Sequence, residues 1–69
     1  MVKITKEQYE EIRDANSMSE RAELLAEYAG IETHEYKAHQ YFINGGTFVG
    51  DSENYTIMDV LNNAGIEVE

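Results

Sequence analysis

Carboxylates are the reactive side chains that this sequence offers in greatest number. Its 69 residues contain fourteen Asp and Glu against five Lys and Arg, which gives a net charge of −9. Paired carboxylates perform acid–base catalysis only where their surroundings separate two pKa values, and the sequence shows no apolar pocket beside such a pair. Ser17, Ser19 and Ser52 are better explained as helix caps or loop residues than as nucleophiles. We therefore expect no catalytic residue and predict that the protein is not an enzyme.

The remaining ligand-type residues do not form a metal or cofactor motif. The sequence has no cysteine, and its two histidines, His34 and His39, lie in no cluster with the spacing of metal ligands. On a strand they would face opposite sides of the sheet. The glycines at 45, 46 and 50 lack the Lys-Ser/Thr and the strand-to-helix context of a phosphate-binding loop. We expect no metal and no cofactor.

The net charge favours one kind of partner over two others. Nucleic-acid phosphates and anionic membrane surfaces would be repelled, whereas a basic protein surface would be attracted. No signal peptide, transmembrane segment or lipidation motif is evident. We therefore expect a complete soluble protein that stays in the cytoplasm and binds neither nucleic acid nor membrane.

Seven carboxylates are expected on two consecutive helices. The first helix is predicted over residues 6–15 and the second from Met18 or Glu20 to Ala29. The first stripe consists of Glu7, Glu10, Glu11 and Asp14. The second stripe consists of Glu20, Glu23 and Glu27. We call these seven residues the acidic surface. Helical neighbours three or four apart place side chains roughly 5–6 Å apart, a scale comparable to that of phosphates along a DNA strand. The stripes are either solvated helix faces or a rigid mimic of a nucleic-acid backbone.

The helix ends carry clear signals. Thr5 with Gln8 and Ser17 with Glu20 match the capping box, in which side chain and backbone cap each other reciprocally. A third helix is predicted after Thr56, and it ends at Gly65. The tight connection between the first two helices predicts that they are antiparallel neighbours.

A hairpin over residues 36–49 is predicted from the apolar residues that flank Asn44-Gly45-Gly46. A turn at Gly45-Gly46 would place Ile43 opposite Phe48, and we prefer this register because it pairs apolar residues. A turn at Asn44-Gly45 would place Phe42 opposite Thr47, and Asn-Gly is the stronger turn dipeptide. Residues 2–4 are expected as a short strand or an extended arm, and residues 66–69 as an edge strand.

These elements follow the order α-α-β-β-α-β and predict a single α+β domain over residues 1–69. Three short helices should pack on one face of a small, mainly antiparallel sheet built around the 36–49 hairpin.

Two functional hypotheses follow from this profile. The first is an acidic inhibitor or antagonist, encoded by a phage or mobile element, that mimics nucleic acid. Its acidic surface would block the basic surface of a nucleic-acid-handling defence protein in the host cell's cytoplasm. The alternative is a structural or accessory module that forms a homodimer through the apolar hairpin face, in particular through Tyr41 and Ile43.

Overall fold

The chain has an α+β architecture in the computed structural model, which describes residues 2–34 and 39–69. In order, the elements are β1 (Lys3–Ile4), α1 (Lys6–Arg13), α2 (Met18–Ala29), β2 (Ile31–His34), β3 (Gln40–Ile43), β4 (Thr47–Asp51), α4 (Ile57–Asn63) and β5 (Glu67–Val68). The fold class and the predicted order of helices and strands are confirmed. The stretch before the hairpin turn contains two strands, β2 and β3, and residues 35–38 of the predicted hairpin lie outside the described residues.

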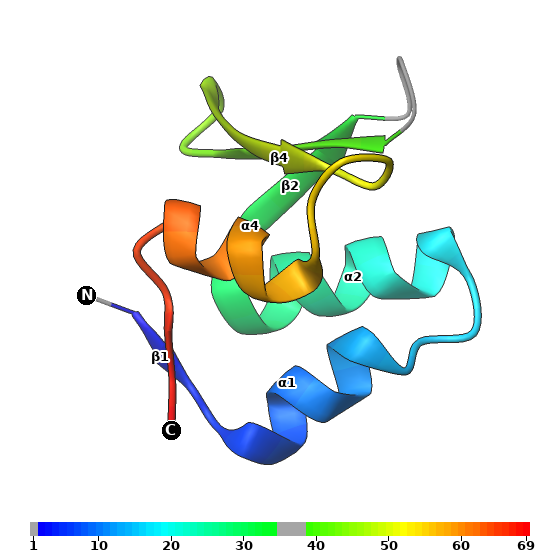
Figure 1. The fold of residues 1–69 in the computed structure, drawn as a ribbon, viewed down its shortest axis with the longest axis vertical. Coiled ribbons are helices and arrows are strands. Elements are labelled where there is room, and N and C mark those ends of the chain that lie inside the picture. The colour runs from blue at the N-terminus through cyan, green and yellow to red at the C-terminus, as the bar shows by residue number, and fades with distance from the viewer. Residues whose placement is uncertain (1, 35–38) are drawn as a thin grey trace.

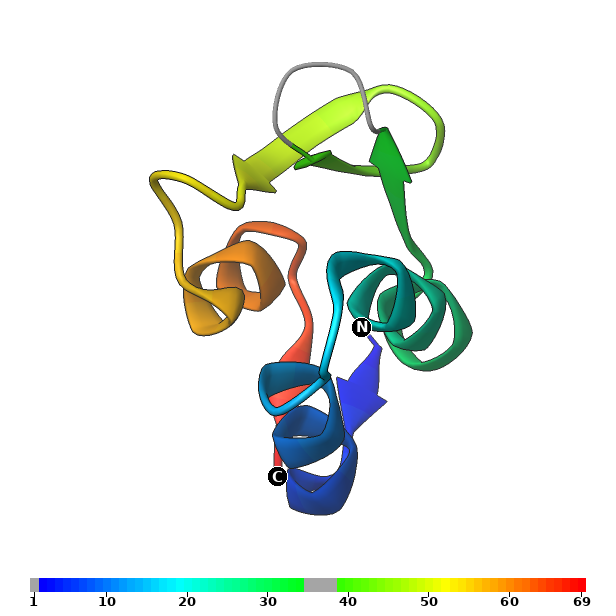
Figure 2. The same cartoon turned by 90° about the vertical axis from the view of Figure 1, so that its right-hand side faces the viewer.

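The elements form layers that Figures 1 and 2 show from two sides. Strands β2, β3 and β4 make an antiparallel sheet in the order β2-β3-β4. Helices α2 and α4 pack on one face of this sheet, and α1 packs on α2 away from it. The sequence predicts an edge strand at residues 66–69, but β5 instead pairs with β1 in a separate parallel sheet of two strands.

Closed capping boxes start two of the helices. At α1 the Thr5 side chain accepts a hydrogen bond from the Gln8 amide at 3.1 Å, and the Gln8 side chain accepts one from the Thr5 amide at 2.8 Å. Thr56 and Asp59 cap α4 in the same way. These reciprocal bonds satisfy amide groups that a helix start leaves without partners, so each helix begins at a defined residue.

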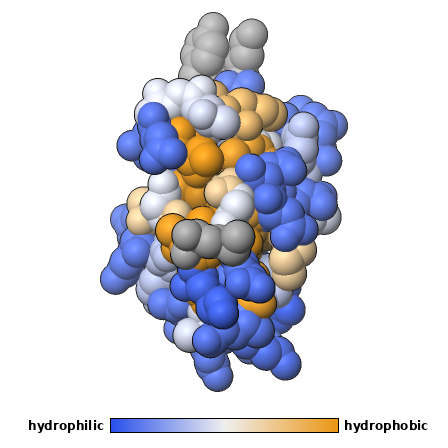
Figure 3. All heavy atoms as spheres, turned by 90° about the vertical axis from the view of Figure 1, so that its left-hand side faces the viewer, coloured by the Kyte–Doolittle hydropathy of each residue, from blue (hydrophilic) through white to orange (hydrophobic). Residues whose placement is uncertain are grey.

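A single core joins nearly all of the elements. Its largest fully buried side chains are Ile4, Ile12, Leu25, Ile31, Tyr41, Val49, Val60 and Leu61. They come from every described helix and from strands β1 to β4, so the helices and the three-stranded sheet share one hydrophobic cluster. Figure 3 shows that apolar atoms also reach the surface on one side of the molecule, with hydrophilic atoms around them.

The hairpin adopts neither of the two predicted registers. Asn44 and Gly45 have φ values of 51° and 73°, and the Gly46 amide donates to the Ile43 carbonyl at 3.2 Å. These values indicate a turn centred on Asn44-Gly45, but Ile43 pairs with Thr47, so Gly46 is an extra loop residue. Phe42 consequently lies opposite Phe48.

An irregularity next to this pair leaves two consecutive residues of β4 buried. Phe42 pairs with Phe48 whereas Tyr41 pairs with Gly50, which leaves Val49 as an additional residue in β4. Val49 is buried in the core, while Phe48 is 42% exposed. Alternation along the strand already puts Val49 on the face opposite to Phe48. The bulge adds Gly50, which is also buried and lies opposite Tyr41.

Gly50 provides a test of how closely β4 approaches α4. A Cβ atom at this position would lie 2.8 Å from Cγ2 of Val60 and 3.0 Å from Cγ of Tyr55. We expect Gly50→Ala to lower the free energy of unfolding by about 1–3 kcal/mol, because the new methyl group overpacks the site. Urea denaturation followed by circular dichroism measures this change.

The matched control is Gly46→Ala, since a Cβ atom there would meet nothing within 4 Å. We expect it to change the free energy of unfolding by less than about 1 kcal/mol. Equal losses in both variants would contradict the close contact between β4 and α4.

Candidate functional site

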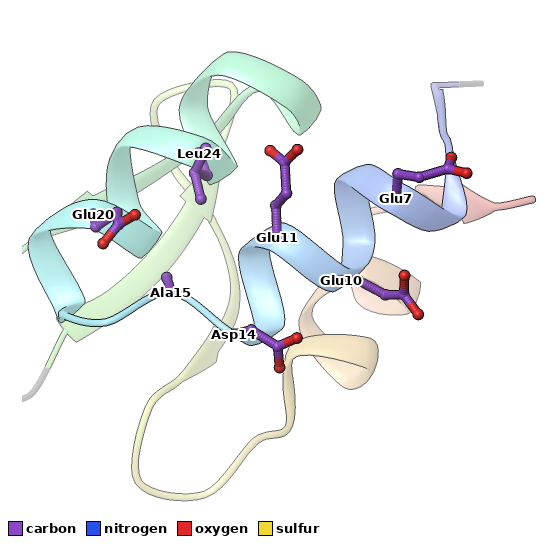
Figure 4. Close-up of a pocket in the computed structure, with 7 residues that line it drawn as sticks. All are labelled: Glu7, Glu10, Glu11, Asp14, Ala15, Glu20 and Leu24. Carbon is purple, nitrogen blue, oxygen red and sulfur yellow. The ribbon is translucent and has the colours of Figure 1, made fainter.

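The acidic surface is built by α1 and α2, which pack against each other. Between the two helices lies a shallow groove of about 470 Å³, lined by Glu7, Glu10, Glu11, Asp14, Ala15, Glu20 and Leu24. Figure 4 shows Glu7, Glu10 and Glu11 projecting from α1 and Asp14 from its C-terminal end, with the carboxylate of Glu11 turned toward α2. Five of the seven predicted residues are thus brought together around one concave area.

The other two predicted residues extend this surface without lining the groove. Glu23 and Glu27 are exposed on α2. Glu27 lies about two helical turns from Glu20 and therefore on the same side of α2. Of the seven carboxylate residues, Glu10 is half-buried and the other six are exposed.

Asp14 differs from the other six because its charge is balanced. Arg13 Nε and Nη2 donate to its two carboxylate oxygens at 3.0 and 3.1 Å. This hydrogen bonding, reinforced by the positive charge of Arg13, lowers the pKa of Asp14 below its usual value. Among the described residues, the ion pairs are Arg13–Asp14 and Lys3–Glu67, so the other six carboxylates of the acidic surface have no ion-pair partner there.

Hydrogen bonds orient two of these six carboxylates. The Tyr28 hydroxyl donates to Glu11 across the interface between α1 and α2. The Glu20 carboxylate accepts from the Asn16 amide at 3.2 Å and not from Ser17, so the second predicted capping box is only half formed. Both carboxylates keep their acceptor character but lose freedom of motion, which makes this part of the surface rigid.

Arg21 holds the two helices together. Its guanidinium donates from Nε to the Ile12 carbonyl and from Nη2 to the Arg13 carbonyl, at 3.1 Å each. These carbonyls belong to the last turn of α1, where a helix leaves its acceptors unpaired. Arg21 therefore caps the C-terminal end of α1 from the first turns of α2.

The position of Arg21 in the sequence indicates this contact, although the sequence analysis did not predict it. A cation near the start of a helix is unfavourable for the helix dipole, so Arg21 is out of place if α2 is considered alone. Its position becomes favourable once the C-terminal end of α1, which attracts cations, is placed beside it.

Both residues predicted for self-association lie on the side of the sheet that faces the helices, and the burial of Tyr41 corrects the prediction for that residue. Tyr41 is 1% exposed and Ile43 is half-buried against the core. Burial is the main cause that raises the pKa of the Tyr41 phenol. Because side chains alternate along β3, Phe42 is the residue that faces away from the helices. The hairpin face that a second copy could contact therefore does not contain the Tyr41 side chain.

A second hollow is less suited to a charged partner. It measures about 380 Å³ and is lined by Met58, Asn62, Gly65, Ile66, Glu67 and Val68. Its one carboxylate, that of Glu67, lies 3.8 Å from Lys3 Nζ. Across the described residues, no three Asp, Glu or His side chains come together as metal ligands. None of the described helices has the length and hydrophobicity that a membrane span requires.

The Arg21 contact can be tested without a change of charge. We expect Arg21→Lys to lower the free energy of unfolding by about 1–2 kcal/mol, because an ammonium lacks the planar fork of donors with which the guanidinium reaches both carbonyls. Arg13→Lys is the matched control and should have little effect, since its pair with Asp14 is solvent-exposed. Thermal and urea unfolding measure both variants, and an equal response would contradict a helix-joining role for Arg21.

The Tyr28–Glu11 hydrogen bond predicts a pH dependence. This bond is the largest cause that raises the pKa of Tyr28 above its ordinary value of 10.0, and burial and the negative charge of Glu11 add to it. Because the pKa of Tyr28 is raised in the folded state, the hydrogen bond contributes fully to the free energy of unfolding below pH 10. This contribution is lost as the pH rises through the folded-state pKa.

We therefore expect Tyr28→Phe to be less stable than the wild type at pH 8, and the difference to shrink above pH 10. Denaturant unfolding at a series of pH values measures it. Tyr55→Phe serves as control, since no hydrogen bond of the Tyr55 hydroxyl is seen among the described contacts. A stability difference that stays constant up to high pH would rule out the bond as its source.

Comparisons with known proteins provide no relative for this geometry. No protein-family model, curated protein or solved structure was found to match the chain. What the acidic surface does must therefore be inferred from its own contacts, burial and charge.

Proposed function

We propose that this protein is an acidic binding module whose acidic surface occupies the basic, nucleic-acid-binding surface of another protein and blocks it. The observation that carries the proposal is the set of six carboxylates on α1 and α2 that have no ion-pair partner among the described residues. Four of them line one groove together with the paired Asp14. A basic surface would supply the missing countercharges.

The arrangement of the charges supports nucleic-acid mimicry over a diffuse attraction. The carboxylates follow helical spacing, which sets neighbouring side chains roughly 5–6 Å apart in rows on two adjoining rods. A groove that binds regularly spaced phosphates would meet a comparable row of anions. Such complementarity raises the association rate and selects against acidic partners.

Rigidity supports the same proposal. The Arg21 guanidinium joins the two helices, and hydrogen bonds from Tyr28 and from the Asn16 amide hold Glu11 and Glu20. Side chains that are already ordered lose less entropy on binding, so more of the electrostatic attraction appears as affinity. Small size and strong acidity motivate a narrower form of the proposal. In this form, a phage or mobile element encodes the chain, which antagonises a nucleic-acid-handling defence protein in the host cytoplasm.

Charge reversal on the two helices tests the proposal. We expect Glu10→Lys/Glu27→Lys to weaken binding to a basic partner at least about tenfold, because each reversal replaces an attraction with a repulsion. The matched control, Glu53→Lys/Glu69→Lys, changes the net charge equally at positions outside the acidic surface. Proteins captured from host lysate by the wild type at low salt are identified, purified and assayed for binding to duplex DNA and RNA.

In this competition assay the wild type and the control should displace the nucleic acid, and the reversed variant should not. Raising the salt concentration from about 50 to 500 mM should weaken the displacement, because the exposed charges become screened. If the Glu10/Glu27 variant competes as well as the control, the acidic surface is not the binding site.

A further inference from the structure

Four aromatic side chains form a continuous row over the three-stranded sheet. His34 on β2 packs edge-to-face on Phe42 of β3, with ring centroids 4.7 Å apart. Phe42 packs on Phe48 of β4 at 5.7 Å, and Phe48 packs on Tyr55 at 5.9 Å. The row, which we call the aromatic strip, crosses the sheet from one edge strand to the other and continues onto the loop before α4.

The aromatic strip is accessible to a partner. Phe48 and Tyr55 are 42% and 37% exposed, His34 is exposed and Phe42 is half-buried. No described helix covers this face, because α2 and α4 both pack on the opposite side of the sheet (Figure 2). A contiguous exposed patch of large apolar residues is typical of an interaction site, whereas single exposed apolar residues are common on any protein surface.

Charge decides which ligand these rings can accept. Exposed aromatic rings on a sheet commonly stack on nucleic-acid bases or on guanidinium groups. Glu32 is exposed and lies directly opposite Phe42 in the register, which puts its carboxylate on the same face as the strip. With a net charge of −9, the protein would repel the phosphates that accompany bases. A guanidinium carries the opposite charge and also stacks on aromatic faces.

We propose that the aromatic strip is a second binding surface, and that it receives arginine side chains from an extended basic segment of a partner protein. The rings supply the stacking surface, and Glu32 supplies a carboxylate at its border. Arginine is favoured over lysine, because the planar guanidinium can stack on a ring and bind a carboxylate at the same time.

The aromatic strip and the acidic surface face different directions. The sheet lies at one end of the molecule and α1 at the other, with α2 and α4 between them (Figures 1 and 2). One flat partner surface cannot cover both, so the strip does not depend on the function proposed for the acidic surface. The two proposals can therefore fail separately.

The test uses two blocked peptides, hexa-arginine and hexa-lysine, titrated into the isotope-labelled protein and followed by NMR. We expect hexa-arginine to bind about two- to fivefold more tightly than hexa-lysine, with shift changes at Phe42, Phe48 and Tyr55. Phe48→Leu keeps the apolar bulk and removes the π face, so it should abolish this preference. Val2→Ala, which alters an apolar side chain that is 49% exposed elsewhere, should preserve it.

The acidic-surface variant Glu10→Lys/Glu27→Lys separates the two proposals. It should weaken both peptides alike and leave the arginine preference intact. Equal affinity for the two peptides, or a preference that persists in Phe48→Leu, would overturn the role of the strip. Two further outcomes would also overturn arginine as the ligand of the strip. Binding of oligo-dT there would make the strip a nucleic-acid site. Sedimentation of the wild type as a dimer that Phe48→Leu makes monomeric would make it a contact between two copies of the chain.

Discussion

The contact between Arg21 and the end of α1 is the interaction on which the acidic surface depends. Two short helices that both carry rows of carboxylates repel each other across their shared groove. The guanidinium offsets this repulsion by binding two main-chain carbonyls, which lie at the negative end of α1. It achieves this without pairing with any carboxylate of the acidic surface. The surface can therefore stay highly charged and still belong to one rigid unit.

Charged and apolar side chains are likewise kept apart in the rest of the fold. The core is made of aliphatic side chains and one tyrosine, and no charged residue is buried among the described residues. Charges consequently remain at the surface, and the shape of the molecule decides where they gather. Because α2 and α4 cover one face of the sheet, the other face presents its aromatic residues to solvent. A domain this small thus presents two surfaces of different chemistry, an anionic one at α1 and α2 and an aromatic one on the sheet.

Local chemistry made the helices predictable. Thr5, Ser17 and Thr56 cap helices where the sequence places them, because capping depends on residues only three positions apart. The hairpin register could not be predicted in the same way. It depends on whether Gly46 joins the turn, which neither of the two-residue turns considered from the sequence allows, and on the bulge that leaves Val49 without a partner in β3. Tyr41 and Phe42 show the consequence, since both are apolar neighbours and only the register tells which one faces the helices.

The candidate site was predictable to a similar degree. Helical spacing correctly placed six of the seven carboxylate residues within two adjoining helices, but α1 ends at Arg13, before the predicted residue 15, and the pairing of Asp14 with Arg13 could not be foreseen. Adjacent residues within a helix do not face each other. Asp14, however, is the C-cap of α1, with φ −94° and ψ 8°, and this departure from helical geometry accompanies its pairing with Arg13. The Tyr28–Glu11 bond was beyond prediction because it depends on how closely the two helices approach.

The parallel pairing of β1 with β5 has a consequence for how the chain folds. The two strands come from opposite ends of the described chain, so their backbone bonds close a loop that contains every other element. Ordering such a long loop costs more entropy than forming a helix or the hairpin, and its contacts are of the slow, non-local kind. Strand β1 leads directly into α1. The first acidic helix is therefore held at both of its ends, by the β1–β5 pairing at its start and by Arg21 at its C-terminal end.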